Sequence, residues 1–97
     1  MPSYITLLRY TQQGVEKIKD SLTRLEAAKQ SVRALGGELK AFHLVMGQYD
    51  AVVISEAPDD ETATKFALAT AARGFARTER LRAYTEQEYR NIIATLP

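Results

Sequence analysis

The sequence predicts an α+β fold of the ferredoxin-like type, with the element order β-α-β-β-α-β and an added C-terminal helix. Two observations carry this prediction. Four short runs rich in β-branched and aromatic residues are interspersed with longer segments of helical periodicity. The second and third runs, residues 38–46 and 49–57, are separated by only two residues, which is typical of a hairpin. A chain of 97 residues has room for one core, so we expect a single domain over residues 1–97.

The first half of the chain predicts a strand followed by a long helix. Residues 4–10, "YITLLRY", predict the strand. Apolar residues then recur at spacings of three, four or seven, which puts them on one helical face. These residues are Val15, Ile18, Leu22, Leu25, Val32 and Leu35. Gly36 and Gly37 predict the end of this helix.

The second half predicts two further helices around the last strand. Pro58 closes the third strand, and the acidic residues 59–61 favour the start of a helix over residues 60–73. Residues 75–84, "FARTERLRAY", predict the fourth strand. The stretch "TEQE" over residues 85–88 matches a capping box, and one apolar stripe follows it. The stripe consists of Tyr89, Ile92, Ile93 and Leu96. We expect it to pack against its own chain or against a partner.

The two-residue loop Gly47-Gln48 predicts a type II′ turn, which pairs Met46 with Tyr49. One face of the hairpin then carries Lys40, Phe42, Leu44, Met46, Tyr49, Ala51, Val53 and Ser55. The other face carries Leu39, Ala41, His43, Val45, Asp50, Val52, Ile54 and Glu56. Both faces are mostly apolar, whereas helices joined by right-handed crossovers cover only one. The pattern predicts a homodimer of packed sheets, or a higher oligomer built from such dimers. The alternative is that the C-terminal helix folds across the second face.

His43 and Asp50 are the candidate catalytic residues, because this register makes them diagonal neighbours on one face. A carboxylate can orient an imidazole and raise its pKa, so the pair can serve as a general base. The alternatives are a satisfied pair in an interface, or an Asp50 that accepts backbone N–H bonds and fixes the turn. Tyr49 points to the opposite face, where it either packs against Met46 or donates a hydrogen bond to a ligand.

The only concentration of basic residues consists of Arg73, Arg77, Arg80 and Arg82. Arg80 and Arg82 share a strand face with Tyr84, whereas Arg77 points the other way. Arginine suits a carboxylate or phosphate ligand, so these residues favour a small anion pocket near the dimer contact. The alternative is solvated charge that protects an edge strand from unwanted pairing. The candidate ligand-binding residues are therefore Tyr49, Asp50 and Arg80.

Composition narrows the classes of function. The chain has no cysteine and one histidine, so we expect no metal site and no cofactor. The net charge is +1 without a basic block, which argues against a nucleic-acid partner. No apolar run approaches the length of a membrane span, and no signal peptide is evident at the N-terminus. We expect a soluble, cytoplasmic protein.

Several segments together resemble the GYD domain family, small bacterial proteins named for a glycine–tyrosine–aspartate signature. The segments are "YTQQGVEKIKD", "MGQYDAVVISEAPDD" and "GFARTERLRAYTEQEY", so the resemblance extends over nearly the whole chain. The signature stands here as Gly47, Tyr49 and Asp50, with Gln48 inserted after the glycine. The resemblance implies a ferredoxin-like fold of the dimeric α+β barrel type. It supplies no established biochemical function and no catalytic residues to transfer.

Three functions remain open from the sequence. The first is a homo-oligomeric module that binds a small molecule or has a regulatory role. The second is a cofactor-free enzyme, isomerase or monooxygenase-like, that uses His43 or Asp50 in a dry cavity on a small organic molecule. The third is a purely structural oligomerisation module. A concave pocket that contains both His43 and Asp50 would favour the enzyme.

Overall fold

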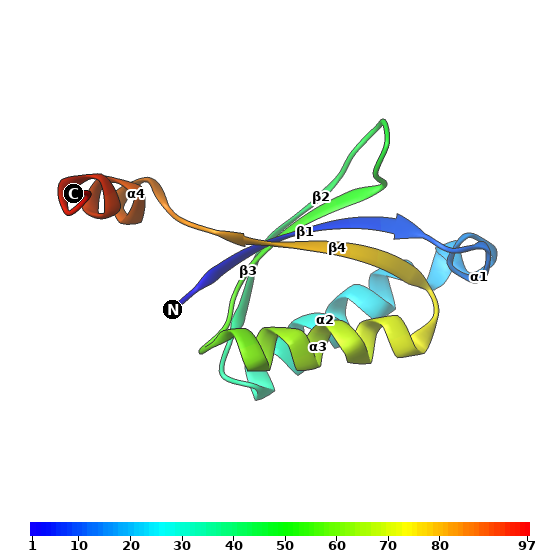
Figure 1. The fold of residues 1–97 in the computed structure, drawn as a ribbon. Coiled ribbons are helices and arrows are strands. Elements are labelled where there is room, and N and C mark those ends of the chain that lie inside the picture. The colour runs from blue at the N-terminus through cyan, green and yellow to red at the C-terminus, as the bar shows by residue number, and fades with distance from the viewer.

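The computed structural model describes all of residues 1–97 and contains one four-stranded antiparallel sheet in the order β2-β3-β1-β4 (Figure 1). The strands are β1 Ser3–Tyr10, β2 Glu38–Leu44, β3 Ala51–Glu56 and β4 Ala76–Ala83. Both main helices lie on the same side of the sheet, which we call the inner face; the opposite side is the outer face. This arrangement confirms the predicted α+β fold with a ferredoxin-like strand order.

The helices are α1 Gln12–Glu16, α2 Ser21–Ala34, α3 Asp60–Arg73 and α4 Glu86–Ala94, with a 3₁₀ turn, η1, over Ile18–Asp20. None of them combines the length and the apolar content needed to cross a membrane. The single helix predicted from residue 15 is wrong in its first part, because the chain breaks at Lys17. Gly14 in this first part packs closely against the residue before β4: a Cβ on Gly14 would lie 2.0 Å from the Phe75 carbonyl oxygen. This contact with the chain just before β4 holds α1 in a position of its own, apart from α2.

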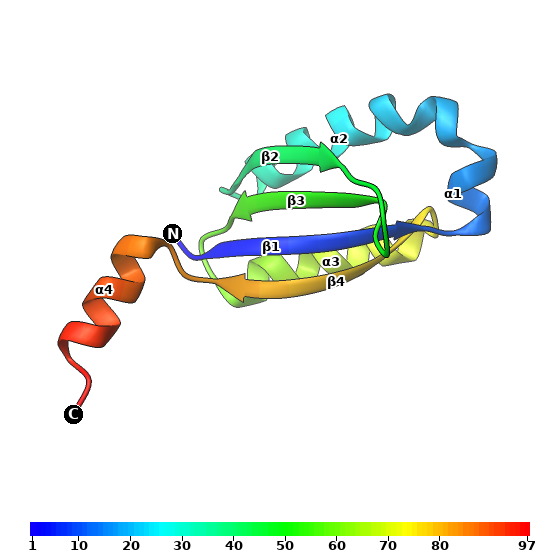
Figure 2. The same ribbon diagram turned by 90° about the horizontal axis from the view of Figure 1, so that it is seen from above.

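The two main helices contact opposite edges of the sheet. Figure 2 shows α2 along the β2 edge and α3 behind β1 and β4. The inner face of the two central strands therefore lies between the helices. It carries Tyr4, Thr6, Leu8 and Tyr10 from β1, and Ala51, Val53 and Ser55 from β3. This strip is the floor of the cavity described below.

The connection between β2 and β3 is longer than predicted. His43 pairs with Val52, and the Val45 N–H donates to the Asp50 carbonyl at 2.9 Å, so the predicted register is confirmed. The two-residue turn is wrong, however, because the strands end at Leu44 and Ala51 and residues 45–50 form a loop. The Asp50 N–H donates to the Leu8 carbonyl at 2.8 Å, which draws the chain toward β1. The loop rises from the outer side of the sheet (Figure 1).

A β-bulge near Lys40 corrects one further part of the predicted hairpin. Leu39 pairs with Ser55 and lines the inner face, whereas the sequence put it on the outer one. The Lys40 ammonium is 3.6 Å from Glu38 and 3.4 Å from Glu56, so Lys40 moves to the outer side. The reason is the period of two in a strand, in which a one-residue shift exchanges the faces.

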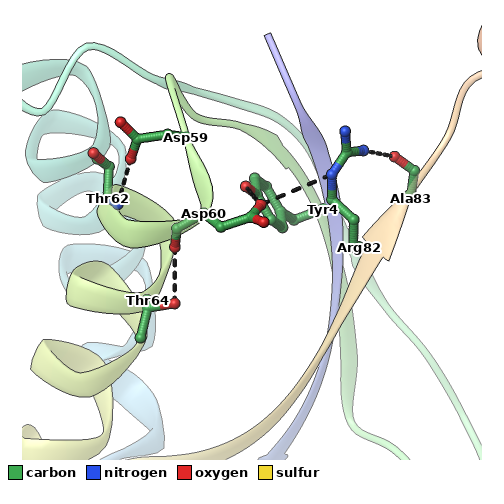
Figure 3. Close-up of polar contacts among 7 residues, drawn as sticks. All are labelled: Tyr4, Asp59, Asp60, Thr62, Thr64, Arg82 and Ala83. Atoms are coloured by element: carbon green, nitrogen blue, oxygen red, sulfur yellow. Dashed lines mark hydrogen bonds and ion pairs between the residues drawn. The ribbon is translucent and has the colours of Figure 1, made fainter.

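A polar cluster fastens the start of α3 to the sheet (Figure 3). Tyr4 is a buried residue, 4% exposed, and its hydroxyl donates to the Asp60 carboxylate at 2.5 Å. The same carboxylate lies 3.9 Å from the Arg82 Nε on β4. Asp59 caps the helix by accepting the Thr62 N–H at 2.8 Å. Burial, followed by the hydrogen bond to Asp60, raises the pKa of Tyr4 to about 12.

The chain leaves an unusual amount of surface exposed for its size. Its accessible area is 6814 Å², whereas a compact monomer of this mass exposes about 5,500 Å². Its radius of gyration is 14.6 Å against about 12.5 Å for a compact chain of this length. Helix α4 explains much of the difference, because it projects away from the sheet (Figures 1 and 2). The alternative in which this helix covers the outer face is therefore wrong.

The raised pKa of Tyr4 predicts that the protein loses stability at alkaline pH. Its folded pKa is raised from 10.0 to about 12, so its stabilising contribution is complete below pH 10 and is lost as the pH rises to about 12. At pH 8 we expect the unfolding free energy of wild type to be larger than that of Tyr4→Phe. We expect this difference to shrink between pH 10 and 12. Urea unfolding followed by circular dichroism measures it, with the exposed Tyr89→Phe as control. A difference that stays constant with pH would contradict the assignment.

Candidate functional site

The concave site of the molecule is a cavity of about 380 Å³ between the inner face and the two main helices. Its floor is the central strip of β1 and β3, and its walls come from α2 and α3. Most of its lining is apolar, including Leu8, Phe42, Val53 and Phe66. Of the candidate site residues named from the sequence, Arg80 lines this cavity, whereas His43, Tyr49 and Asp50 do not.

Arg80 reaches the cavity from β4 because its pairing with Thr6 puts it on the inner face. Its Nη1 donates to the Ala63 carbonyl of α3 at 2.8 Å, and no carboxylate lies within ion-pair distance. Arg80 is partly buried, and this burial lowers the pKa of its guanidinium. Arg77 lies on the outer face opposite Arg9, so Arg77 and Arg80 have different environments although they share a strand.

Arg24 on α2 is a second cation in the cavity wall, and the sequence did not single it out as a site residue. Its Nη1 donates to the Lys17 carbonyl at 2.9 Å, and its guanidinium lies 4.3 Å from the centre of the Phe75 ring. Its Nη2 is buried without a hydrogen-bond partner. The signal available in the sequence was an arginine directly before Leu25, on the apolar stripe of a helix.

The structure gives the two candidate catalytic residues separate environments. Asp50 Oδ2 accepts the backbone N–H of Tyr10 at 2.9 Å, so this carboxylate ties the hairpin to the end of β1. His43 on β2 pairs with Val52 of β3, and its side chain is exposed. Its imidazole makes no hydrogen bond. The backbone-binding alternative for Asp50 thus describes the geometry. The cavity lies on the other side of the sheet from His43.

Tyr49 is held over the outer face, not against Met46 as one prediction had it. Its hydroxyl donates to the Glu79 carboxylate of β4 at 2.5 Å, and this bond raises the pKa of Tyr49. The Arg9 guanidinium lies 4.7 Å from the ring centre, and its Nε donates to the Gln48 carbonyl at 2.9 Å. Met46 is fully exposed. Residues from two other strands therefore pin the loop in place.

The three signature residues thus have one shared structural role. Gly47 has a φ of 131°, a conformation that favours glycine, and this allows the loop to leave the plane of the sheet. Tyr49 then fastens the loop to β4, and Asp50 fastens it to β1. The arrangement fits a clamp on the loop. The cavity itself offers a place for an apolar body beside the arginines Arg24, Arg73 and Arg80. No three His, Asp or Glu side chains gather into a set that suits a metal ion.

His43 and Asp50, the two candidate catalytic residues, should differ sharply in their effect on stability. Asp50→Ala removes the acceptor of the Tyr10 N–H, and we expect it to lower the unfolding free energy by about 1–3 kcal/mol. His43→Ala removes an exposed side chain without a hydrogen bond, so its effect should stay within about 0.5 kcal/mol. Chemical denaturation measures both. A His43→Ala change as costly as Asp50→Ala would show that the two side chains act together.

Comparison with known proteins identifies the family and the fold of the chain. The chain is 33% identical over 84 residues to the "Glutamine synthetase and cystathionine beta-lyase binding protein" of Thermus thermophilus, covering 86% of this chain and 88% of the relative. The crystal structure of TTHA0845 from Thermus thermophilus superimposes with a TM-score of 0.54 at 22% identity, covering 88% of this chain and 95% of that one, which supports the fold. The family model described as "GYD domain" matches residues 4–93. The chain therefore belongs to the GYD domain family.

Proposed function

We propose that this protein is a homo-oligomeric binding module that regulates other proteins by contacting them. The observation that carries the proposal is its 33% identity, over most of both chains, to a relative named as a binding protein for two enzymes. By analogy, glutamine synthetase and cystathionine β-lyase of the source organism are the first partners to test. The separation of His43 and Asp50 from the cavity favours binding over the cofactor-free enzyme.

Helix α4 offers the surface for such a protein partner. Three apolar residues of the helix and Leu96, two residues beyond its end, form one stripe, and all are exposed: Tyr89 by 60%, Ile92 by 42%, Ile93 by 49% and Leu96 by 65%. Its start is stabilised by a complete capping box, in which the Thr85 side chain accepts the Glu88 N–H and the Glu88 side chain accepts the Thr85 N–H. A preformed amphipathic helix that projects from its domain suits an apolar groove in a partner.

The outer face of the sheet offers the surface for a second copy. Its centre is apolar, and the side chains that alternate away from the helices are Ile5, Leu7, Val52, Ile54 and Leu81. Charged residues such as Lys40, Glu56 and Arg77 lie toward its ends and edges. An apolar centre with a polar rim is typical of protein interfaces. The excess of about 1,300 Å² over a compact monomer also favours association.

Self-association through the outer face has a direct test. At micromolar concentration, we expect analytical ultracentrifugation of wild type to give a molecular mass of twice the chain mass of 10.8 kDa. Ile54→Lys buries a charge in the proposed contact and should give a monomer. Leu68→Lys makes the same kind of change at an exposed position of α3, 65% exposed, and should leave the dimer intact. Wild type at 10.8 kDa would refute the dimer.

Partner binding can be tested separately on α4. Biolayer interferometry with the two enzymes of the source organism should detect binding by wild type and a loss of about tenfold or more for Ile93→Lys, which introduces a charge into the stripe. Asn91→Lys adds the same charge on the opposite side of the same helix and should bind as wild type does. Absence of binding to either enzyme, or equal losses for the two variants, would contradict the proposal.

A further inference from the structure

We propose that the cavity on the inner face is a binding site for a small amphipathic carboxylate, whose apolar body covers the floor of β1 and β3 and whose carboxylate meets Arg80. This goes beyond the proposed contact with protein partners, since neither α4 nor the outer face takes part in it. The volume of the cavity, about 380 Å³, lies within the range of ligand pockets.

The fold holds this cavity open from both sides. Helix α3 is fastened to the central strand β1 through Tyr4 and Asp60, and it contacts the edge strand β4. At the other end, the Thr11 hydroxyl donates to the Gly74 carbonyl at 2.6 Å, and its N–H donates to the Phe75 carbonyl at 3.1 Å. Helix α2 contacts β2 on the opposite edge. Because each helix is anchored to a different edge, neither covers the central strands.

The interior of this space is suited to an apolar body. The residues from the floor and walls include Leu8, Leu25, Phe42, Val53 and Phe66. Water between such surfaces gains few hydrogen bonds, so its replacement by an apolar group is favourable. A ligand of this kind would also bury surface that the chain alone leaves in contact with solvent.

The charges around the cavity specify an anion. A guanidinium has five N–H donors, and Arg80 uses one of them on the Ala63 carbonyl. The nearby acids are engaged elsewhere, Asp60 by Tyr4 and Arg82, and Glu56 by Lys40. Arg24 adds further positive charge in the cavity wall. A carboxylate from outside would supply an acceptor for the remaining donors of Arg80, and its planar geometry matches the arginine fork.

A pair of probes separates recognition of charge from simple apolar binding. Octanoate and 1-octanol have the same chain, and only the first carries a carboxylate. Isothermal titration calorimetry on the whole chain should show tighter binding of octanoate. Arg80→Met should weaken octanoate by about tenfold or more and leave octanol unchanged, because a charge-assisted hydrogen bond is lost. Arg77→Met removes an arginine from the same strand on the outer face and should bind octanoate as wild type does.

A second measurement on wild type keeps the test decisive if Arg80→Met does not fold. In methyl NMR spectra, octanoate should shift Leu8 and Val53, which face the cavity, and leave the neighbouring Leu7 and Val52 of the outer face in place. No binding of octanoate at millimolar concentration, equal affinity for octanol, or shifts confined to the outer face would overturn the assignment. None of these outcomes depends on the partner enzymes, so failure here is distinct from failure of the proposed function.

Discussion

The hydrogen-bond ladder along β1 is the interaction on which the rest of the structure depends. This strand pairs with β4 over its whole length and with β3 from Ser3 to Leu8. Two backbone groups of β1 near the end of its pairing with β3 also form hydrogen bonds. The Leu8 carbonyl accepts the Asp50 N–H, and the Tyr10 N–H donates to the Asp50 carboxylate. Tyr4 extends the same strand to α3. Both the anchor of α3 and the hairpin loop are therefore attached to a single central strand.

This dependence on hydrogen bonds follows from how little the chain buries alone. Seven of its 97 residues are buried, and none of the large side chains is fully enclosed. Three apolar surfaces remain: the cavity, the outer face and the stripe on α4. A small domain gains stability mainly from apolar burial, so each of these surfaces gains by being covered. The proposed ligand, second copy and protein partner are three ways to cover them.

Local patterns in the sequence were enough to predict the order of the elements and the pairing of His43 with Val52. The long loop was beyond such reasoning, because the Asp50 N–H bonds to a strand that lies about forty residues away in the sequence. The close contact of Gly14 with Phe75 is likewise made between residues far apart in the sequence. For the candidate site, alternation along β4 correctly put Arg80 and Arg77 on opposite faces. The expected place of Arg80 near the dimer contact was wrong, because its side chain lies on the inner face and bonds to α3. The buried Nη2 of Arg24 could not be predicted, because Phe75, which lies beside the guanidinium, comes from a distant part of the sequence.

The loop over residues 45–50 has a geometric consequence for anything that settles on the outer face. It stands above the sheet at one end and is held there, because Tyr49 and Arg9 tie it to β4 and β1 (Figure 1). A flat partner that moved along the strands would collide with it. The loop therefore limits how far a second sheet can extend in that direction, and it removes sliding as a degree of freedom. Through this loop, the residues of the signature define where an assembly on the outer face must stop.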